Sequence, residues 1–240
     1  MSYLFNNISL KDENRLANIS FSMFSNSLIL LGVIFIDVGA DKTNMLLYKD
    51  NYLTHSKVIP LGSKSVTKDI AAYLQTSIKQ AEIIKHEHVS ALSDFADSES
   101  NFELSIENDD LTKSINKKEI SKIAELRYED IIDQIKSELK LLGMDISDIR
   151  SGIKITGGGS NVRNLDLLFK KHFESTKCEY LSISNIVFKE NLEDRRELST
   201  LIGLLSWPIF NVEDSSPTVG VKNFKSITKS ISSIWKGFFE

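Results

Sequence analysis

The sequence feature that most constrains the fold is an apolar run over residues 28–36, LILLGVIFI, which ends directly before Asp37. The run is too short to cross a bilayer as a helix, because about 20 residues are needed. The charged residues Asp12, Glu13 and Arg15 before the run argue against a signal peptide. A short run with apolar side chains on both faces is typical of a strand buried inside an α/β sheet. We therefore predict a central strand over residues 32–37.

Composition and charge exclude several classes of protein. Hydrophobic residues make up 41% and charged residues 26% of the 240 residues, which is ordinary for a globular chain. The formal charge of −4 gives no reason to expect a nucleic-acid partner. The single cysteine, Cys178, excludes an internal disulfide and fits a reducing cytoplasm. No Cys/His cluster has the spacing of a zinc site, so we predict no metal site.

Hydrophobic periodicity predicts a β-meander followed by helices and further strands. The predicted strands are residues 32–37, 43–48, 52–60, 102–106, 152–156 and 183–188. The predicted helices are residues 64–74, 80–88, 117–142, 161–172, 198–206 and 224–239. The helix at 117–142 has the clearest pattern, because its apolar residues recur at steps of three and four before Gly143. Residues 94–110 carry seven acids and no base, so we expect an edge strand with an acidic outer face there.

The first candidate site is the turn DVGADKT over residues 37–43, between two predicted strands. A tight turn lets backbone N–H groups converge on a phosphate, and Gly39 permits a close approach. Asp37 could hold a metal-bound water, and Thr43 could offer a hydroxyl group. The alternative is an ordinary hairpin, which the pattern by itself favours.

Two further candidate sites lie on later elements. Gly157, Gly158 and Gly159 separate a predicted strand from a predicted helix, which leaves room for a flat ligand and favours negative charge nearby. The alternative is a flexible loop. Glu82 and Lys85 lie three positions apart on a predicted helix and could grip a ribose and a base edge. The alternative for this pair is a solvated surface ion pair.

The order and spacing of these motifs resemble the ATPase superfamily of actin, Hsp70 and the sugar kinases. Within that superfamily the sequence resembles FtsA, a bacterial cell-division family. The segments that carry the resemblance are GVIFIDVGADKT, HSKVIPLGSKSVTKDIA, AEIIK, ITGGGSNVRNLDLLFKKHF and STLIGLL, and it covers about residues 30–240. It implies that the hairpin is a second phosphate-binding loop, that the glycine turn is an adenosine loop, and that ATP with Mg is the ligand. The residues it assigns to the nucleotide are Asp37, Gly39, Thr43, Glu82, Lys85, Gly157, Gly158 and Gly159.

The sequence also departs from the family pattern. Ala40, Asp41 and Lys42 replace the glycine-rich centre of the phosphate loop, so Asp41 would bring a carboxylate near the phosphates. The half-chain that precedes this region in the family, with its first phosphate loop, is not found, and we interpret the chain as a truncated member. These departures weigh against ATP binding. We expect no measurable ATPase activity from this chain alone.

The resemblance implies an α/β fold, an actin-like (ribonuclease H-like) lobe with a small inserted α+β subdomain and a C-terminal amphipathic helix. The predicted boundaries are a weakly structured segment at 1–31, the lobe at 32–80 and 153–210, the inserted subdomain at 81–152, a linker at 211–222 and the helix at 223–240.

The predicted C-terminal helix has an apolar stripe flanked by lysines, which is typical of a helix that lies in a membrane interface. The stripe and its lysines are Phe224, Ile227, Ile231, Ile234, Trp235, Phe238, Phe239, Lys225, Lys229 and Lys236. Four lysines and one glutamate give residues 222–240 a charge of +3, which leaves −7 on residues 1–221. An anionic membrane surface should therefore attract the tail and repel the body. The alternative is a terminal helix docked on the core.

The function implied by the resemblance is a peripheral protein on the cytoplasmic side of the inner membrane at the division site. It would tether the FtsZ polymer, whose C-terminal tail is expected to bind the inserted subdomain near Arg127 and Lys136. Other division proteins and self-association are further implied partners. Two alternatives stay open: an actin/Hsp70-like ATP-binding protein, and a pilus-type actin-like adaptor without ATPase activity.

Overall fold

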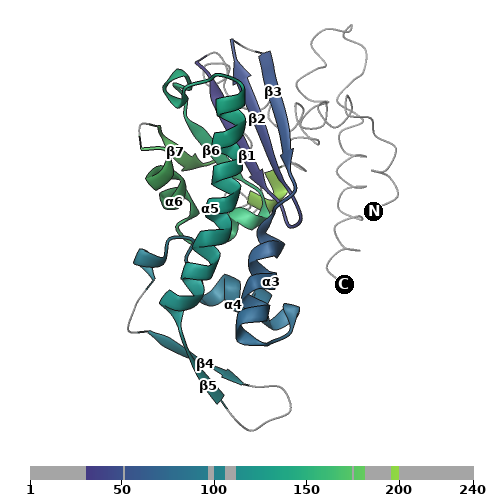
Figure 1. Ribbon diagram of the computed structural model, residues 1–240, viewed down its shortest axis with the longest axis vertical. Coiled ribbons are helices and arrows are strands. Elements are labelled where there is room, and N and C mark those ends of the chain that lie inside the picture. Colours follow the sequence, from purple (N-terminus) through teal and green to yellow (C-terminus); the bar gives the residue numbers. More distant parts are fainter. Residues whose placement is uncertain are drawn as a thin grey trace, which may run out of the picture. The chain divides into compact units, whose positions relative to one another are not determined.

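The computed structural model describes residues 31–50, 52–96, 100–105, 112–174, 176–181 and 196–199. Several predicted features lie outside these residues: the segment before residue 31, the strand at 183–188, most of the helix at 198–206, the linker at 211–222 and the helix at 223–240. The described elements form a five-stranded sheet, a two-stranded sheet and the helices that pack on them (Figure 1).

The five-stranded sheet has the strand order β3-β2-β1-β6-β7. Strands β1 (Val33–Val38), β2 (Thr43–Lys49) and β3 (Tyr52–Ile59) form the predicted antiparallel meander. Strands β6 (Ile153–Thr156) and β7 (Cys178–Tyr180) continue the sheet in parallel on the other side of β1. The predicted central strand is confirmed, because β1 is paired on both sides and residues 33–36 are 0% exposed.

The helices pack on one face of this sheet. They are α3 (Ser63–Leu74), α4 (Ile78–His88), α5 (Lys117–Leu141) and α6 (Leu165–His172). Their buried apolar side chains join Ile34, Ile36 and Val38 of β1 in one large core cluster. The helices predicted at 64–74, 80–88 and 117–142 are confirmed, with small differences at their ends.

Helix α5 connects the two sheets, as Figure 1 shows. It begins after Asn116, whose side chain accepts hydrogen bonds from the first amides of the helix and so satisfies donors that have no partner within it. Near its other end Glu138 contacts His55 at 2.8 Å and Lys57 at 2.7 Å, both on β3. Helix α5 therefore connects the two-stranded sheet at one of its ends to the five-stranded sheet near the other.

The two-stranded sheet pairs β4 (Asn101–Ser105) with β5 (Thr112–Asn116) in antiparallel register. The edge strand predicted at 102–106 is confirmed as β4, whereas its partner β5 was not predicted. The sequence of β5, TKSIN, offers only one apolar side chain, so no alternation marks it. His88 at the end of α4 stacks on Phe102 of β4, with ring centroids 4.1 Å apart. The inserted subdomain at 81–152 stays a prediction.

The prediction that a helix starts at residue 161 directly after the glycines is wrong. The chain instead forms a 3-10 turn over Gly158–Asn161, and α6 begins only at Leu165. Ser160 closes that turn by donating hydrogen bonds from its amide and hydroxyl to the Gly157 carbonyl. Arg163 is then drawn to the end of α4, where its guanidinium donates to the carbonyls of Glu87 and Val89. The helix N-terminus is thus displaced from the glycines, and the predicted electrostatic benefit for an anion there is lost.

Helices long and apolar enough to cross a membrane are absent from the described part of the chain.

Candidate functional site

The predicted phosphate turn follows the C-terminal end of β1 and packs against the start of α3. Gly39 donates its amide to the Lys42 carbonyl at 2.9 Å, which closes the turn between β1 and β2. The carbonyls of Gly39 and Ala40 accept hydrogen bonds from the amides of Ser63 and Lys64, at 3.0 and 2.8 Å. The first amides of α3 therefore contact the turn itself, and they are not directed at a ligand.

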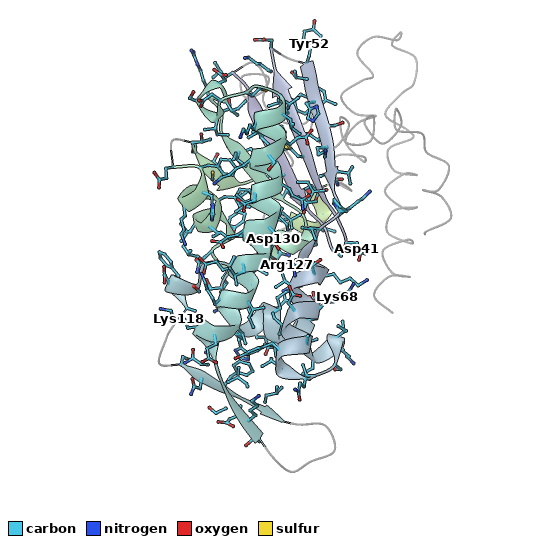
Figure 2. The ribbon with its side chains drawn as sticks, viewed as in Figure 1. Asp41, Tyr52, Lys68, Lys118, Arg127 and Asp130 are labelled. Carbon is cyan, nitrogen blue, oxygen red and sulfur yellow. The ribbon has the colours of Figure 1, made fainter. Side chains whose placement is uncertain are left out.

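Asp37 and Thr43 flank this turn but differ in environment. Thr43 is fully buried, and its hydroxyl donates to the Leu61 carbonyl at 2.8 Å, so the structure uses it to hold the chain before α3. Asp37 is half-buried, and burial raises the pKa of its carboxyl group, while a hydrogen bond with Asn44 and the charge of Lys42 oppose the shift. Asp41 is exposed at the turn (Figure 2) and pairs with Lys64 at 3.3 Å.

The glycine turn lies directly against the phosphate turn. A side chain at Gly157 would overlap Asp37 Oδ1 and come within 2.5 Å of the Val38 carbonyl oxygen. A Cβ at Gly159 would lie 2.7 Å from Val38 Cγ1 and 2.8 Å from Ser63 Cβ. Gly158 differs, since an added Cβ would meet only Glu197 Cβ at 3.5 Å. Two of the three glycines are therefore explained by close packing of β6 on β1 and α3.

Glu82 and Lys85 form an ion pair in which the lysine is buried, so Lys85 is not available to bind a ligand. Lys85 is 1% exposed, and its Nζ contacts both carboxylate oxygens of Glu82 at 2.8 Å, Thr67 Oγ1 at 2.9 Å and the Ser63 carbonyl at 3.4 Å. Burial by itself would raise the pKa of Glu82, but hydrogen bonds from Lys85 and Thr67 outweigh it and lower the pKa. Lys85 thus fastens α4 to the start of α3, while Glu82 keeps partial access to solvent.

A pocket of about 820 Å³ opens beside this pair, between the phosphate turn, the start of α3 and α4. Its lining residues are Ala40, Ser63, Lys64, Ile78, Lys79, Glu82, Ile83, His86 and Glu87. His86 contacts Glu82 at 3.1 Å. The pocket offers two lysines for anionic groups, Glu82 for hydroxyl groups and two exposed isoleucines for an apolar or flat surface. Sequence reasoning missed Lys79, Ile83 and His86, although they fall on the same side of one helix as Glu82.

A short segment at 196–199 covers the glycine turn and was also missed. Arg196 donates to the Ser160 carbonyl at 2.6 Å, and its guanidinium lies 3.6 Å from the ring centroid of Tyr180. Asn161 donates to Glu197 at 3.1 Å, and the hydroxyls of Thr156 and Ser199 are 2.9 Å apart. No periodic pattern could have indicated the contacts with Thr156, Ser160 and Asn161, because these partners are 36 to 43 positions away along the chain.

The predicted partner-binding residues Arg127 and Lys136 are not brought together. Arg127 faces α3, where its Nε is 2.7 Å from Asp69, and it also contacts Asp130 on α5 at 3.0 Å (Figure 2). Lys136 faces α6 and lies 3.2 Å from His172 Nδ1 and 5.4 Å from the Phe173 ring centroid. Nine positions on a helix turn the side chain by about half a circle, so the two residues lie on opposite sides of α5.

Comparison with known proteins decides the family. A family model described as "Cell division protein FtsA" matches residues 34–203, which include all of the five-stranded sheet except Val33 and all the described helices. The chain belongs to the FtsA family. It is 34% identical over 128 residues to FtsA of Bacillus subtilis (strain 168), an alignment that covers 53% of this chain and 29% of the relative. It is 25% identical over 194 residues to FtsA of Escherichia coli (strain K12), covering 78% of this chain and 46% of the relative. The chain thus spans less than half the length of these FtsA relatives.

Solved structures show that this FtsA-family chain has an actin-like fold. MreB5 of Spiroplasma citri bound to ADP is similar with a TM-score of 0.62 at 20% identity, over 85% of this chain and 61% of that chain. A PilM–PilN type IV pilus biogenesis complex is similar with a TM-score of 0.59 at 15% identity, over 79% of this chain and 50% of that chain. The α/β, actin-like fold expected from the sequence is therefore confirmed. Within the described ranges, no group of three or more His, Cys, Asp or Glu side chains is placed to hold a metal ion.

Proposed function

We propose that this FtsA-family chain is a peripheral membrane tether for the FtsZ polymer, on the cytoplasmic side of the inner membrane at the bacterial division site. The observation that carries the proposal is the FtsA match over residues 34–203, followed in sequence by a basic amphipathic tail. Other division proteins and further copies of the chain are proposed as additional partners. The tether needs two ends, and each end can be tested separately.

The membrane end is proposed to be the tail at 223–240. Each lysine near an anionic surface contributes roughly 1 kcal/mol, and a fully buried Phe or Ile contributes about 1.5–3 kcal/mol. These contributions are offset in part by the cost of ordering the helix. The net charge of −7 on residues 1–221 opposes contact between the body and an anionic membrane. Binding should therefore be reversible, weakened by salt and dependent on anionic lipid.

Co-sedimentation with vesicles tests the membrane end. Trp235→Glu places a charge in the apolar stripe and should release the full chain from vesicles that contain anionic lipid. Ser233→Glu is the matched control, because it adds the same charge on the opposite side of the predicted helix and should leave most binding intact. A chain ending at Gly220 should not sediment. If that shortened chain binds as well as the full chain, the tail is not the anchor.

The polymer end is proposed to be the part of the chain around α5. Arg127 already has two carboxylate partners, while Lys136 has an imidazole and an aromatic ring as neighbours. Because they lie on opposite sides of α5, one groove can use only one of them. Fluorescence anisotropy with a labelled FtsZ C-terminal peptide should therefore show a loss of affinity for Arg127→Ala or for Lys136→Ala, but not for both. Unchanged affinity in both variants would place the peptide elsewhere.

A second candidate function is nucleotide binding in the pocket beside Glu82. The pocket lies where the phosphate turn, the start of α3 and α4 meet, and MreB5, which shares the fold, is bound to ADP in its solved structure. This one lobe offers few donors and excludes little water, so a transferring phosphoryl group would be poorly stabilised. We expect Mg-ATP to bind more weakly than about 100 μM and to show no measurable hydrolysis. Calorimetry that finds a low-micromolar constant abolished by Glu82→Gln would establish the ATP-binding alternative instead.

A further inference from the structure

Another pocket, with a volume of about 610 Å³, lies between the C-terminal ends of α5 and α6 and the residues that follow each helix. It shares no lining residue with the pocket beside Glu82, so it is a separate site. Figure 1 shows α5 and α6 beside each other. The apolar part of its lining continues the core, because Leu139 and Phe173 belong to the core cluster and Met144 and Ile146 pack against it.

Lys136 lines this pocket and is held in place by α6. Its Nζ lies 3.2 Å from His172 Nδ1 and 5.4 Å from the Phe173 ring centroid. A lysine ammonium group can only donate hydrogen bonds, so Nδ1 accepts, and the proton of the neutral ring is on Nε2. That nitrogen lies 3.2 Å from Glu129 Oε1, which accepts. This chain of hydrogen bonds orients Lys136 but occupies only one of its N–H groups, so the others stay available to a ligand.

The two α5 lysines of the pocket lack a carboxylate partner among the described residues. Lys140 follows Lys136 by about one helical turn and is exposed, whereas Lys136 is half-buried. Lys171, the third lysine of the lining, is by contrast paired with the buried carboxylate of Glu125 at 3.0 Å. The positive charge that is free to attract a ligand is therefore concentrated at Lys136 and Lys140.

The acidic residues of the lining do not neutralise these two lysines. Asp145 accepts a hydrogen bond from the Ser147 amide at 2.8 Å, which lowers the pKa of its carboxyl group, so it stays charged at neutral pH. Glu174 is exposed after the end of α6. Neither forms an ion pair with a lysine within the described ranges. The lining thus has an apolar part and, on α5, a separate positive part.

We propose that this pocket binds a short acidic segment of a partner protein. An apolar side chain of the segment packs on Leu139, Met144 and Phe173, and a neighbouring carboxylate pairs with Lys136 and Lys140. A volume of about 610 Å³ lies within the usual range of ligand pockets. Because Lys136 is already oriented, pairing with it costs less side-chain entropy than pairing with a free surface lysine.

The charge of the pocket favours a partner protein over the tail of this chain as the occupant. Residues 222–240 carry a charge of +3, which Lys136 and Lys140 would repel. An acidic segment is attracted by the same two lysines. The inference rests on the proposed function only for the identity of the partner, which would be one of the additional division proteins.

Fluorescence anisotropy with the full chain tests the proposal. The probe is a labelled synthetic peptide that alternates aspartate and leucine, and no FtsZ is present, so this site and the proposed tether can fail separately. We expect a dissociation constant of about 0.1–1 mM. Lys136→Met and Lys140→Met should each weaken binding about three- to fivefold, because each removes one partly exposed ion pair. Lys170→Met is the matched control, since Lys170 lies on α6 outside the lining and pairs with Asp166.

The apolar part of the pocket is tested in the same assay. Met144→Glu places a negative charge in the lining and should weaken binding at least about tenfold. Leu141→Glu is its control, because Leu141 is 80% exposed at the same end of α5 and does not line the pocket. If Met144→Glu also lowers the urea midpoint of unfolding, Met144→Ala decides. A twofold or larger loss of affinity in that variant supports the proposal, and no loss overturns it.

The peptide itself supplies the remaining outcomes. Replacing its aspartates by asparagine, or its leucines by serine, should abolish measurable binding. Equal binding of either altered peptide, unchanged affinity in Lys136→Met and Lys140→Met, or no binding of the probe at millimolar concentration would show that the proposal is wrong. Analytical ultracentrifugation without peptide tests the last alternative. Oligomers that Lys140→Glu dissociates would make a second copy of the chain the occupant and overturn the assignment to a partner protein.

Discussion

The carboxylate of Asp37 occupies the space into which a side chain at Gly157 would project. The Val38 carbonyl oxygen would lie only 2.5 Å from the added Cβ, and Gly157 has a φ of +89°, which L residues rarely adopt. Gly157→Ala should therefore lower the free energy of unfolding by about 3 kcal/mol or more. Urea unfolding followed by circular dichroism measures the loss.

Gly158→Ala is the matched control for that variant within the same turn. An added Cβ there meets only Glu197 Cβ at 3.5 Å, which is an ordinary contact. The free energy of unfolding should change by no more than about 0.5 kcal/mol. A similar loss of unfolding free energy in Gly157→Ala and Gly158→Ala would contradict this explanation. It would mean that the turn needs backbone flexibility at every glycine and that close packing at Gly157 and Gly159 is not the reason for these residues.

Replacing Lys85 should separate α4 from the start of α3. Lys85→Met keeps much of the apolar volume but leaves Glu82, Thr67 and the Ser63 carbonyl without their shared donor. We expect a loss of about 2 kcal/mol, less than for a fully buried pair, because water can reach Glu82. Lys79→Met on the exposed side of α4 should cost little. If the two variants are equally stable, the buried contacts of Lys85 contribute nothing net.

Acid should weaken the fold through Glu125. This buried carboxylate accepts hydrogen bonds from the Ser93 amide and hydroxyl and contacts Lys171 at 3.0 Å and Lys122 at 3.3 Å. Burial would raise its pKa, but these partners lower the pKa to about 2, from an ordinary value of 4.5. Because the folded-state pKa is the lower one, the stabilisation is complete above pH 4.5 and is lost as the pH falls toward 2.

The size of that effect can be measured by urea unfolding across this pH range. A depression of this extent corresponds to about 3 kcal/mol of stability at neutral pH. Glu125→Gln should remove most of the acid dependence, whereas Glu103→Gln at an exposed position should not. An unchanged acid profile in Glu125→Gln would show that other carboxylates cause the acid sensitivity.

The ion pair between Arg127 and Asp69 should contribute only a little to stability. Its Nε–Oδ2 distance is 2.7 Å, but both side chains are about one-third exposed, so water screens the attraction. A double-mutant cycle with Arg127→Ala and Asp69→Ala should give a coupling of about 0.5–1 kcal/mol that decreases in high salt. A larger, salt-independent coupling would show that the pair is a rigid connection between α3 and α5.

Sequence reasoning predicted most of the described helices and strands, but it missed β5 and β7 and misplaced the start of α6. The apolar run before Asp37 predicted β1, because a strand that is buried on both faces is apolar at successive positions. The spacing along α5 predicted that helix, because a helix that is buried on one face has apolar residues at steps of three and four. Strand β5 has only one apolar residue and β7 is only three residues long, so neither shows a period, and pairing with β4 and β6 makes them strands. The start of α6 was misplaced because the contacts of Arg163 with the end of α4 hold the chain extended before it.

The sequence by itself determined the periods of the main elements, the order of the motifs and, through both, the FtsA-like character of the chain. Only the tertiary structure decided what each motif residue contacts. It placed Lys85 inside the core, turned the Thr43 hydroxyl to Leu61, and set Arg127 and Lys136 on opposite sides of α5. The physical reason is that a period records which face of an element is buried, whereas the partner of a polar atom comes from a distant segment that packing brings within hydrogen-bond distance.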